Sequence, residues 1–499
     1  MRILVTGGTG VIGEGLIPLL LKRGDTVRLL SRGAAETREA WPAGIESFPA
    51  DISDPETLIG CAEGCDAVVH ISGIVEEHPP EVTFESVNVM GTGNLLAACK
   101  ASGTPRFVFI SSLGAERGSS PYHRSKLAAE QLVREYPGEW LVIRSGNVYG
   151  PGDEIISLLI RLVRTLPVVP VIGDGEQPFQ PVYYTDLGRC LAAAIDAEGV
   201  SGETLDVAGN ETTSTRDLIE RISKIVGLEP TLVPVPSIAT ALVTRAAKAA
   251  GLEFPLNESK LTMLLEGNVI PSGGENALTG RFEIAPVSLD EGLHDLVLNL
   301  PEVRPREGVG PLERHAFHAD ITGSAKTPEE MIEDFRVHYR EILPIEFGVE
   351  DEPDQALEEG AAVTADIPVR GRIQIRVEEV SARRITFATL AGHPLAGVVR
   401  FSARPLGDSI RFEIETLIRA GSWIDFIGMK LGGEVAQEMN WSETVSRMVD
   451  RSGGEAAGGV EVEREILHKD ERERTEASIE RTISASQKDR REEQAKKSA

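Results

Sequence analysis

The sequence is poor in cysteine and in long apolar runs, and each shortage excludes a class of protein. Its four cysteines, Cys61, Cys65, Cys99 and Cys190, form no CxxC pair and have no histidine at zinc spacing, so we expect free thiols and neither a disulfide framework nor a metal site. No apolar stretch approaches the roughly 20 residues of a membrane span. Residues 1–8 lack the pattern of a signal peptide, so we predict a cytoplasmic protein without stable membrane insertion.

Basic charge is also scarce. The chain has 51 Lys and Arg against 78 Asp and Glu, a net charge of −27. No basic face is therefore available to neutralise phosphates, which excludes nucleic acid as a partner. Hydrophobic residues make up 41% of the 499 positions, and this length predicts a globular protein of two or three domains.

The first 150 residues alternate short apolar strands with amphipathic helices. We expect helices at residues 87–102 and 121–136, and strands at residues 3–5, 27–30, 67–71, 107–110 and 141–143. This alternation predicts an α/β fold, a Rossmann doubly wound parallel sheet covered on both faces. From about 151 to 300 helical stretches, one of them at 237–250, mix with short strands, which indicates a small substrate lobe at the carboxyl ends of the sheet.

The remaining chain changes character. Residues 301–310 are rich in Pro, Gly and charge and are typical of a linker. Residues 311–450 combine a helix at 328–342, alternating strands and a closing helix at 426–447, which predicts an α+β domain with an antiparallel sheet. Residues 451–499 are Gly-rich and then dense in charge, so we expect a disordered tail or a solvated helix.

The segment TGGTGVIG at residues 6–13 lies between the first strand and a helix. Gly7 permits a tight turn, Gly10 lets the backbone approach a pyrophosphate, and Gly13 lets the helix pack closely on the sheet. The phosphates would then bind at the helix N-terminus, where the N–H groups have no partner. A flexible turn is the alternative, but this context favours a dinucleotide site. We assign the cofactor contacts to Thr6, Gly7, Gly10, Val11, Ile12 and Gly13.

The end of the second strand suggests which dinucleotide binds. Arg32 stands where an NAD-specific site usually has an acidic residue. A guanidinium suits the 2′-phosphate of NADP, so we predict NADP, with NAD as the other candidate. The alternative is an ordinary surface arginine.

Tyr122 and Lys126 are four residues apart on a predicted helix and share one face. A phenol ordinarily has a pKa of about 10, and we expect the ammonium and a cationic nicotinamide to lower it. Tyr122 could then exchange a proton with a substrate oxygen. Ser111 and Ser112 end the strand at 107–110. One of them caps the turn, and we expect Ser112 to hydrogen-bond the substrate carbonyl.

The TGGTGVIG loop, the Ser-Ser strand end and the YHRSK segment together resemble the short-chain dehydrogenase/reductase superfamily. VNVMGTGNLLAAC, RSGNVYGPGD and IGDGEQPFQPVYYTDLGRCL resemble its extended and atypical NAD-dependent epimerase/dehydratase-like members, over residues 1 to about 300. The chain is most similar to atypical members related to the nucleotide-binding accessory subunit of respiratory complex I. SSLGAERG stands where sugar-nucleotide epimerases carry a VYG-type turn, which argues against sugar-nucleotide epimerisation.

The resemblance implies roles for matching residues. Tyr122 would be the acid/base, Lys126 would hold the nicotinamide ribose, Ser112 would polarise the substrate and Asn88 would support the active-site structure. The cofactor-contacting segments would also include Asp51, Ile52, Ser72 and Gly73.

Residues 311–450 resemble an uncharacterised bacterial domain family with a START-like helix-grip fold, through FATLAGHPLAGVVRFSAR and the helix after it. This resemblance implies a curved sheet around a long helix and an apolar cavity. His393 and Trp423 would line the cavity or serve only in packing. His315 and His318 are interpreted as linker residues, because no Cys or carboxylate pattern completes a metal site.

Three functions remain open. The first is an NADP-dependent oxidoreductase that transfers a hydride to or from a small or apolar carbonyl or alcohol, with the second domain presenting the substrate. The second is a non-catalytic dinucleotide-binding module coupled to a lipid- or quinone-binding domain. The third is a scaffold whose charged tail recruits partners. A homodimer is compatible with each.

Overall fold

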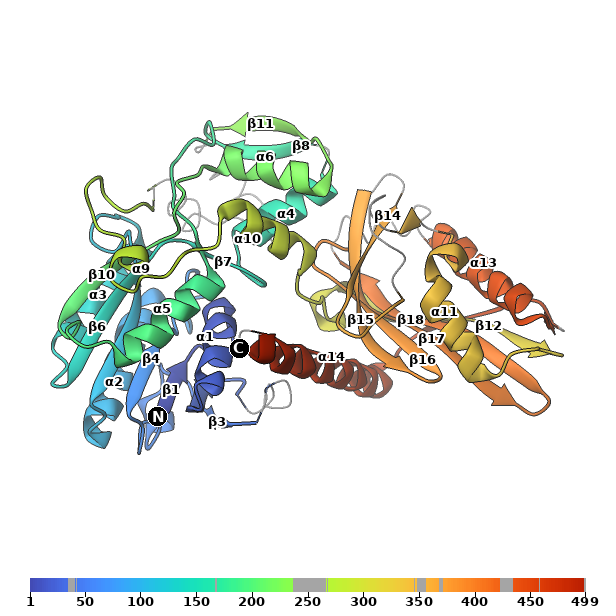
Figure 1. Cartoon of the computed structure of the whole chain (residues 1–499), viewed down its shortest axis with the longest axis horizontal. Helices are drawn as coiled ribbons and strands as arrows, with labels where there is room; N and C mark the ends of the chain where they lie inside the picture. The colour runs from blue at the N-terminus through green and yellow to red at the C-terminus, as the bar shows by residue number, and fades with distance from the viewer. Residues whose placement is uncertain are drawn as a thin grey trace. The chain divides into compact units, whose positions relative to one another are not determined.

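The computed structural model describes residues 1–34, 41, 43–166, 168–236, 266, 268–344, 346–347, 356–367, 371–421, 434–456 and 458–497. Trp423 and the helix expected at 237–250 lie outside the described residues. The chain divides into two compact units, Met1–Val297 with Arg491–Ala499, and Leu298–Arg490 (Figure 1). Each unit has its own hydrophobic core.

A seven-stranded sheet forms the centre of the first unit, in the order β10-β6-β5-β4-β1-β2-β3. All neighbouring strands are parallel. The strands are β1 (Arg2–Thr6), β2 (Thr26–Ser31), β3 (Ile45–Pro49), β4 (Ala67–His70), β5 (Arg106–Ser112), β6 (Glu139–Ser145) and β10 (Glu203–Val207). The predicted Rossmann sheet is confirmed. The chain order reverses between β1 and β4, where folds of this kind bind ligands.

Helices cover both faces of this sheet (Figure 1). Ile3 and Val5 of β1 pack in one core with α1 (Val11–Lys22) and α5 (Tyr184–Asp196). Leu4 points to the opposite core, with α2 (Gly91–Ser102) and α3 (Pro121–Arg134). Because successive side chains of a strand project to opposite faces, a strand that is apolar throughout is buried on both.

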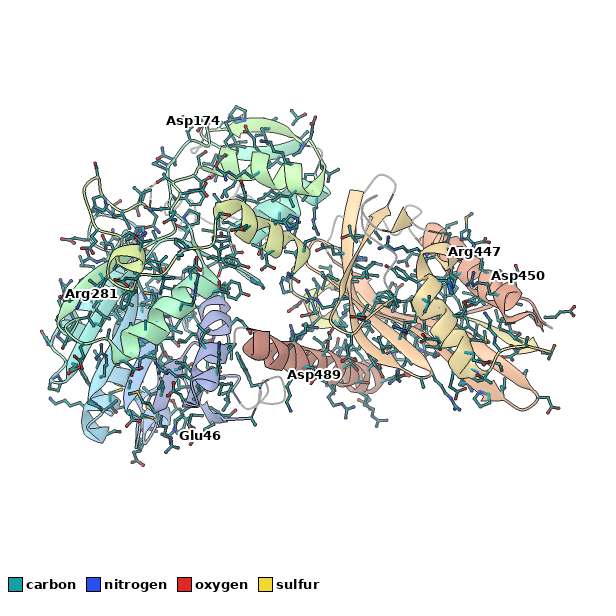
Figure 2. The ribbon with its side chains drawn as sticks, viewed as in Figure 1. Glu46, Asp174, Arg281, Arg447, Asp450 and Asp489 are labelled. Carbon is teal, nitrogen blue, oxygen red and sulfur yellow. The ribbon has the colours of Figure 1, made fainter. Side chains whose placement is uncertain are left out.

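The region after β6 forms the smaller lobe. Its helices α4 (Ile156–Thr165) and α6 (Thr215–Val226) accompany the parallel pair β8 (Val168–Ile172) and β11 (Thr231–Val235). Among the described residues, no helix of the chain is both long and apolar enough to cross a membrane. Charged side chains such as Asp174, Arg281 and Asp450 lie at the surface (Figure 2), where water solvates the charge.

The second unit has an antiparallel sheet in the order β13-β14-β15-β16-β17-β18-β12-β19, with β20 also pairing with β12. Its strands are β12 (Val309–Thr322), β13 (Glu346–Phe347), β14 (Ala362–Ile367), β15 (Gly371–Ser381), β16 (Arg384–Thr389), β17 (Leu395–Leu406), β18 (Ser409–Ala420), β19 (Glu455–Ala456) and β20 (Glu461–Ile466). The predicted antiparallel domain is confirmed. Helices α11 (Pro328–Ile342) and α13 (Glu434–Ser452) pack on one face, and α14 (Lys469–Lys497) packs on the other.

The segment expected as a linker is part of this unit. Glu302 and Pro305 are buried, and β12 begins at Val309. The segment packs because the Glu302 carboxylate pairs with the Arg376 guanidinium, 74 residues later. The linker interpretation of the two histidines was also wrong, since both lie in β12: His315 beside Glu313 and His318 beside Glu461.

Residues 458–497 are folded too, whereas the sequence predicted a disordered tail or a solvated helix. Residues 461–466 pair with β12, and α14 follows. Ile479 and Ile483, one helical turn apart, are fully buried against β-sheet residues Leu312, Ala388, Val398 and Leu417. Two isoleucines at this spacing give an otherwise charged helix one apolar stripe, which composition alone does not reveal. His393 lies in the turn between β16 and β17, where its Nδ1 accepts the Leu395 N–H at 3.0 Å.

Candidate active site

The glycine-rich loop connects β1 to α1. Gly7 has a φ of +70°, and a Cβ there would lie 2.7 Å from the Ser72 backbone nitrogen. A Cβ at Gly13 would lie 2.0 Å from the Gly8 carbonyl oxygen. The protein itself therefore requires glycine at both positions. Gly10 is exposed, and a Cβ there would meet only the Gly7 carbonyl oxygen, at an ordinary 3.5 Å. Space beside Gly10 is thus open to a ligand.

The N-terminus of α1 faces this space. Gly10 is the N-cap, and no side chain caps the helix there. The first N–H groups of a helix have no partner within it, so those of Val11, Ile12 and Gly13 are available to a ligand. With the helix dipole, they fit an anionic group such as a pyrophosphate.

The end of β4 lies against the loop. The Ser72 N–H donates to Thr6 Oγ1 at 3.3 Å. A Cβ at Gly73 would lie 3.2 Å from Asn88 Oδ1 and 3.6 Å from Lys126 Nζ. The structure thus brings Ser72 and Gly73 together with Asn88 and Lys126 at the reversal point of the sheet.

The predicted adenosine contacts lie at the ends of β2 and β3. Arg32 is exposed, and its guanidinium has no hydrogen-bond partner in the described part of the chain. The Ser31 hydroxyl oxygen is buried and equally unpartnered among the described residues. Asp51 Oδ1 accepts both the N–H and the hydroxyl proton of Ser53, at 2.9 and 2.6 Å. Ile52 is buried, and a Cβ at Gly91 would lie 2.9 Å from it.

Helix α3 carries Tyr122 and Lys126. It begins with the N-cap Ser120, whose hydroxyl accepts the His123 N–H, and with Pro121 in the first turn, a sequence that favours a helix start. Lys126 is 5% exposed, and its ammonium lies 4.5 Å from the centre of the Phe109 ring. Burial lowers the pKa of Lys126 to about 8, against an opposing effect of Glu130.

In the protein alone the pKa of Tyr122 is raised, whereas the lowering expected from the sequence included the charge of a bound cationic nicotinamide. Burial, and then the negative charge of Glu154, raise it to about 12. The Tyr122 ring packs edge-on against Phe84, with 6.0 Å between ring centres. The phenol is therefore neutral at pH 7 and has a proton to donate.

Asn88 ties two parts of the site together. It lies in the π-helical turn η3 (Glu85–Met90) and is 2% exposed. Its Oδ1 accepts the Ile74 N–H at 2.8 Å, and its Nδ2 donates to Ser125 Oγ at 3.0 Å. The Ser125 hydroxyl in turn donates to the Tyr122 carbonyl oxygen at 2.7 Å. Asn88 therefore holds the segment after β4 against α3.

Several polar residues of this region were not predicted from the sequence. Buried Glu130 binds Ser111 and Arg144. Glu266 accepts the N–H groups of Ser119 and Ser120 at 2.6 and 2.7 Å, although it is about 146 residues away in the sequence. His70 is fully buried at the end of β4. Only His70 had a detectable signal, since a polar residue closing the apolar run AVVH is unusual.

Comparison with known proteins agrees with this geometry. Residues 3–208 match the NAD dependent epimerase/dehydratase family. The 2-alkyl-3-oxoalkanoate reductase of Stenotrophomonas maltophilia is 28% identical over 255 residues, covering 46% of this chain and 76% of that protein. The ceramide reductase of Caulobacter vibrioides is 28% identical over 243 residues, covering 48% and 75%.

A third relative has another role in its name. The mitochondrial NADH dehydrogenase (ubiquinone) 1 alpha subcomplex subunit 9 of Arabidopsis thaliana is 28% identical over 287 residues, covering 55% of this chain and 71% of that protein. The fold and site define a dinucleotide-binding domain. Residues 3–208 are, more particularly, an NAD-dependent epimerase/dehydratase domain. The predicted NAD-dependent enzyme family and the similarity to a respiratory NADH dehydrogenase subunit are confirmed.

Proposed function

We propose that the first unit is an NADP-dependent reductase that converts a carbonyl of a small or apolar substrate to an alcohol. The observation that carries this proposal is that the neutral Tyr122 phenol lies one helical turn from Lys126 on α3. The Lys126 ammonium and the Asn88 side chain both lie beside Gly73. Two relatives bear the names of reductases, which supports the direction.

The cofactor-binding residues fit a phosphorylated dinucleotide. Gly10 and the uncapped first turn of α1 would hold the pyrophosphate. Arg32 and the Ser31 hydroxyl, both without partners among the described residues, would bind the 2′-phosphate. The chemistry that a reduced nicotinamide supplies when bound is hydride donation to the substrate carbon.

The side chains of this chain supply the proton. Tyr122 donates its hydroxyl proton to the substrate oxygen as that oxygen gains negative charge. Ser112 donates a hydrogen bond to the same oxygen. The Lys126 ammonium binds the ribose hydroxyls, and solvent returns the proton to the phenolate left on Tyr122.

The surroundings of Tyr122 indicate the substrate class. The Phe84 ring packs on Tyr122, and the Glu154 carboxylate acts on it electrostatically. An anionic group beside the phenol would be repelled by Glu154, whereas an uncharged carbonyl with an apolar substituent would not.

Fluorescence titration with NADPH and NADH tests the cofactor assignment. We expect wild type to prefer NADPH and Arg32→Ala to lose the preference while it keeps NADH affinity. A screen of uncharged ketones then compares wild type with Tyr122→Phe, which should bind NADPH normally but lose turnover. Failure of wild type to bind either dinucleotide would refute the proposal.

The similarity to an NADH dehydrogenase subunit favours a second candidate. In it, the dinucleotide is held without turnover, and the second unit binds a lipid or quinone. Under this candidate function, Tyr122→Phe causes no cellular defect, whereas a variant that cannot bind the dinucleotide causes one.

A further inference from the structure

A chain of buried hydrogen bonds crosses the first unit from β1 to η3. His70, the last residue of β4, is fully buried. Its Nδ1 lies 2.7 Å from Thr6 Oγ1, and its Nε2 lies 3.0 Å from Thr92 Oγ1. At one end, Thr6 Oγ1 accepts the Ser72 N–H at 3.3 Å. At the other, the Thr92 hydroxyl donates to the Asn88 carbonyl oxygen at 2.7 Å.

The direction of this chain follows from proton counting. A hydroxyl has one proton, and Thr92 gives its proton to the Asn88 carbonyl. Thr92 Oγ1 must therefore accept from His70, which places the imidazole proton on Nε2. A neutral imidazole has only one N–H, so Nδ1 accepts the Thr6 hydroxyl proton. Every donor and acceptor along the chain is thereby satisfied.

The surroundings of His70 favour the neutral form. Its ring packs against Phe107 and Phe109, with 5.9 and 5.5 Å between ring centres. Burial is the main cause that lowers the pKa of His70 to about 3, and the positive charge of Lys126 adds to it. In such an apolar setting an unmade hydrogen bond is costly, so the chain resists rearrangement.

Both ends of the chain lie at parts of the active site. The Thr6 end adjoins the glycine-rich loop, since a Cβ at Gly7 would lie 2.7 Å from the Ser72 nitrogen. At the opposite end, the Asn88 side chain continues through Ser125 to the Tyr122 carbonyl oxygen. The hydrogen bonds thus run from the dinucleotide loop to the helix that carries the acid.

We infer that His70 is a positioning residue: as an imidazole protonated on Nε2, it fixes the glycine-rich loop relative to Asn88 and the Tyr122 segment through Thr6 and Thr92. The inference rests on the proposed reductase function. Both His70 and Thr92 are fully buried, so we assign them a positioning role and not contact with the substrate. They hold the glycine-rich loop and the helix segment that carries Tyr122 in a fixed position relative to each other.

Thr92→Val provides the sharpest test, because valine has the shape of threonine and removes only the hydroxyl. Thr104→Val is the matched control. Thr104 is also buried, and its hydroxyl donates to the Ala62 carbonyl at 3.3 Å, outside the chain. We expect Thr92→Val to weaken NADPH binding roughly fivefold and to lower kcat, and the control to stay within about twofold of wild type. Thermal unfolding of the same samples measures the stability lost by each.

Ring-nitrogen NMR of histidine-labelled protein reads the tautomer directly, with His70→Phe to assign the signal. We expect a neutral Nε2–H imidazole from about pH 5 to 8, altered in Thr92→Val. His70→Gln, whose amide N–H can reach Thr92, should recover kcat better than His70→Phe. Equal NADPH affinity and kcat in wild type, Thr92→Val and Thr104→Val overturn the inference alone. A wild type that binds no dinucleotide overturns the proposed function and the inference with it.

Discussion

The Ser111 hydroxyl donates to the Glu130 carboxylate at 2.6 Å, whereas the hydroxyl of its neighbour Ser112 accepts, within the described part of the chain, only a long contact of 3.4 Å from the Gly114 N–H. Adjacent residues of a strand project to opposite faces, so the two serines serve different purposes. Glu130 is fully buried and also binds Arg144 through two N–H groups, at 2.9 and 2.8 Å. Ser111 is thus part of a structural ion cluster, and the Ser112 hydroxyl proton is available to a substrate.

Paired alanine substitutions should separate these roles. Ser111→Ala removes a donor from a buried carboxylate and should lower the free energy of unfolding by about 1–3 kcal/mol, with kcat changed less than about twofold. Ser112→Ala should leave stability unchanged and lower kcat roughly 10- to 100-fold. Urea unfolding and steady-state kinetics on both variants measure this, and a reversed pattern would assign the substrate contact to Ser111.

Two glycines of the loop should respond differently to alanine. Gly13→Ala places a methyl 2.0 Å from the Gly8 oxygen, and should destabilise the first unit by about 2 kcal/mol or more. Gly10→Ala meets no crowded atom and should cost only about 0.5–1 kcal/mol as a poorer N-cap. Its methyl would nevertheless block the approach of a pyrophosphate, so NADPH affinity should fall. Normal NADPH affinity in Gly10→Ala would place the pyrophosphate elsewhere.

Burial of Lys126 should appear in the pH dependence of stability. Its pKa falls from 10.5 in the unfolded chain to about 8 in the folded protein. Between these values the unfolded chain binds more protons, so the free energy of unfolding rises with pH from about 8 to 10.5. Lys126→Met should abolish this rise and be more stable than wild type at pH 7, by up to about 3 kcal/mol.

Exposed Lys100 offers the control for this experiment. Lys100→Met should retain the wild-type pH dependence. Urea unfolding at several pH values compares the three proteins. Identical curves for wild type and Lys126→Met would mean that Lys126 is solvated.

The helix at the chain end should matter for stability. Ile483 is fully buried against the sheet of the second unit. Ile483→Ala should lower the free energy of unfolding by about 2–4 kcal/mol, whereas Arg481→Ala, at an exposed position of the same helix, should change it by less than about 0.5 kcal/mol. Equal effects of the two would show that the helix does not pack on the sheet in solution.

The sequence predicted most where its signals are local. The parallel sheet followed from apolar runs separated by amphipathic helices, and the loop at 6–13 from its position between strand and helix. Contacts between residues that are far apart in the sequence gave no such local signal. Glu302 meets Arg376, and Glu266 meets Ser120, only after folding.

Composition misled in two places for a related reason. Residues 301–310 and 451–497 look like solvent-exposed segments because charged residues dominate them. Ion pairs and a few apolar side chains are nevertheless enough to pack both. The direction of the pKa shift of Tyr122 also depended on tertiary structure, since burial and then Glu154, 32 positions further along the chain, raise it.

Residues 461–466 pair with β12 and so cover an edge of that strand that would otherwise be exposed. β18 occupies one side of β12, and β19 and β20 occupy the other. Removing everything after Arg451 would leave the backbone N–H and C=O groups of residues 313–318 without these partners, along a strand open to pairing with other molecules. A truncated chain would therefore tend to self-associate and precipitate. Its loss of function would report a damaged sheet rather than a missing recruitment signal.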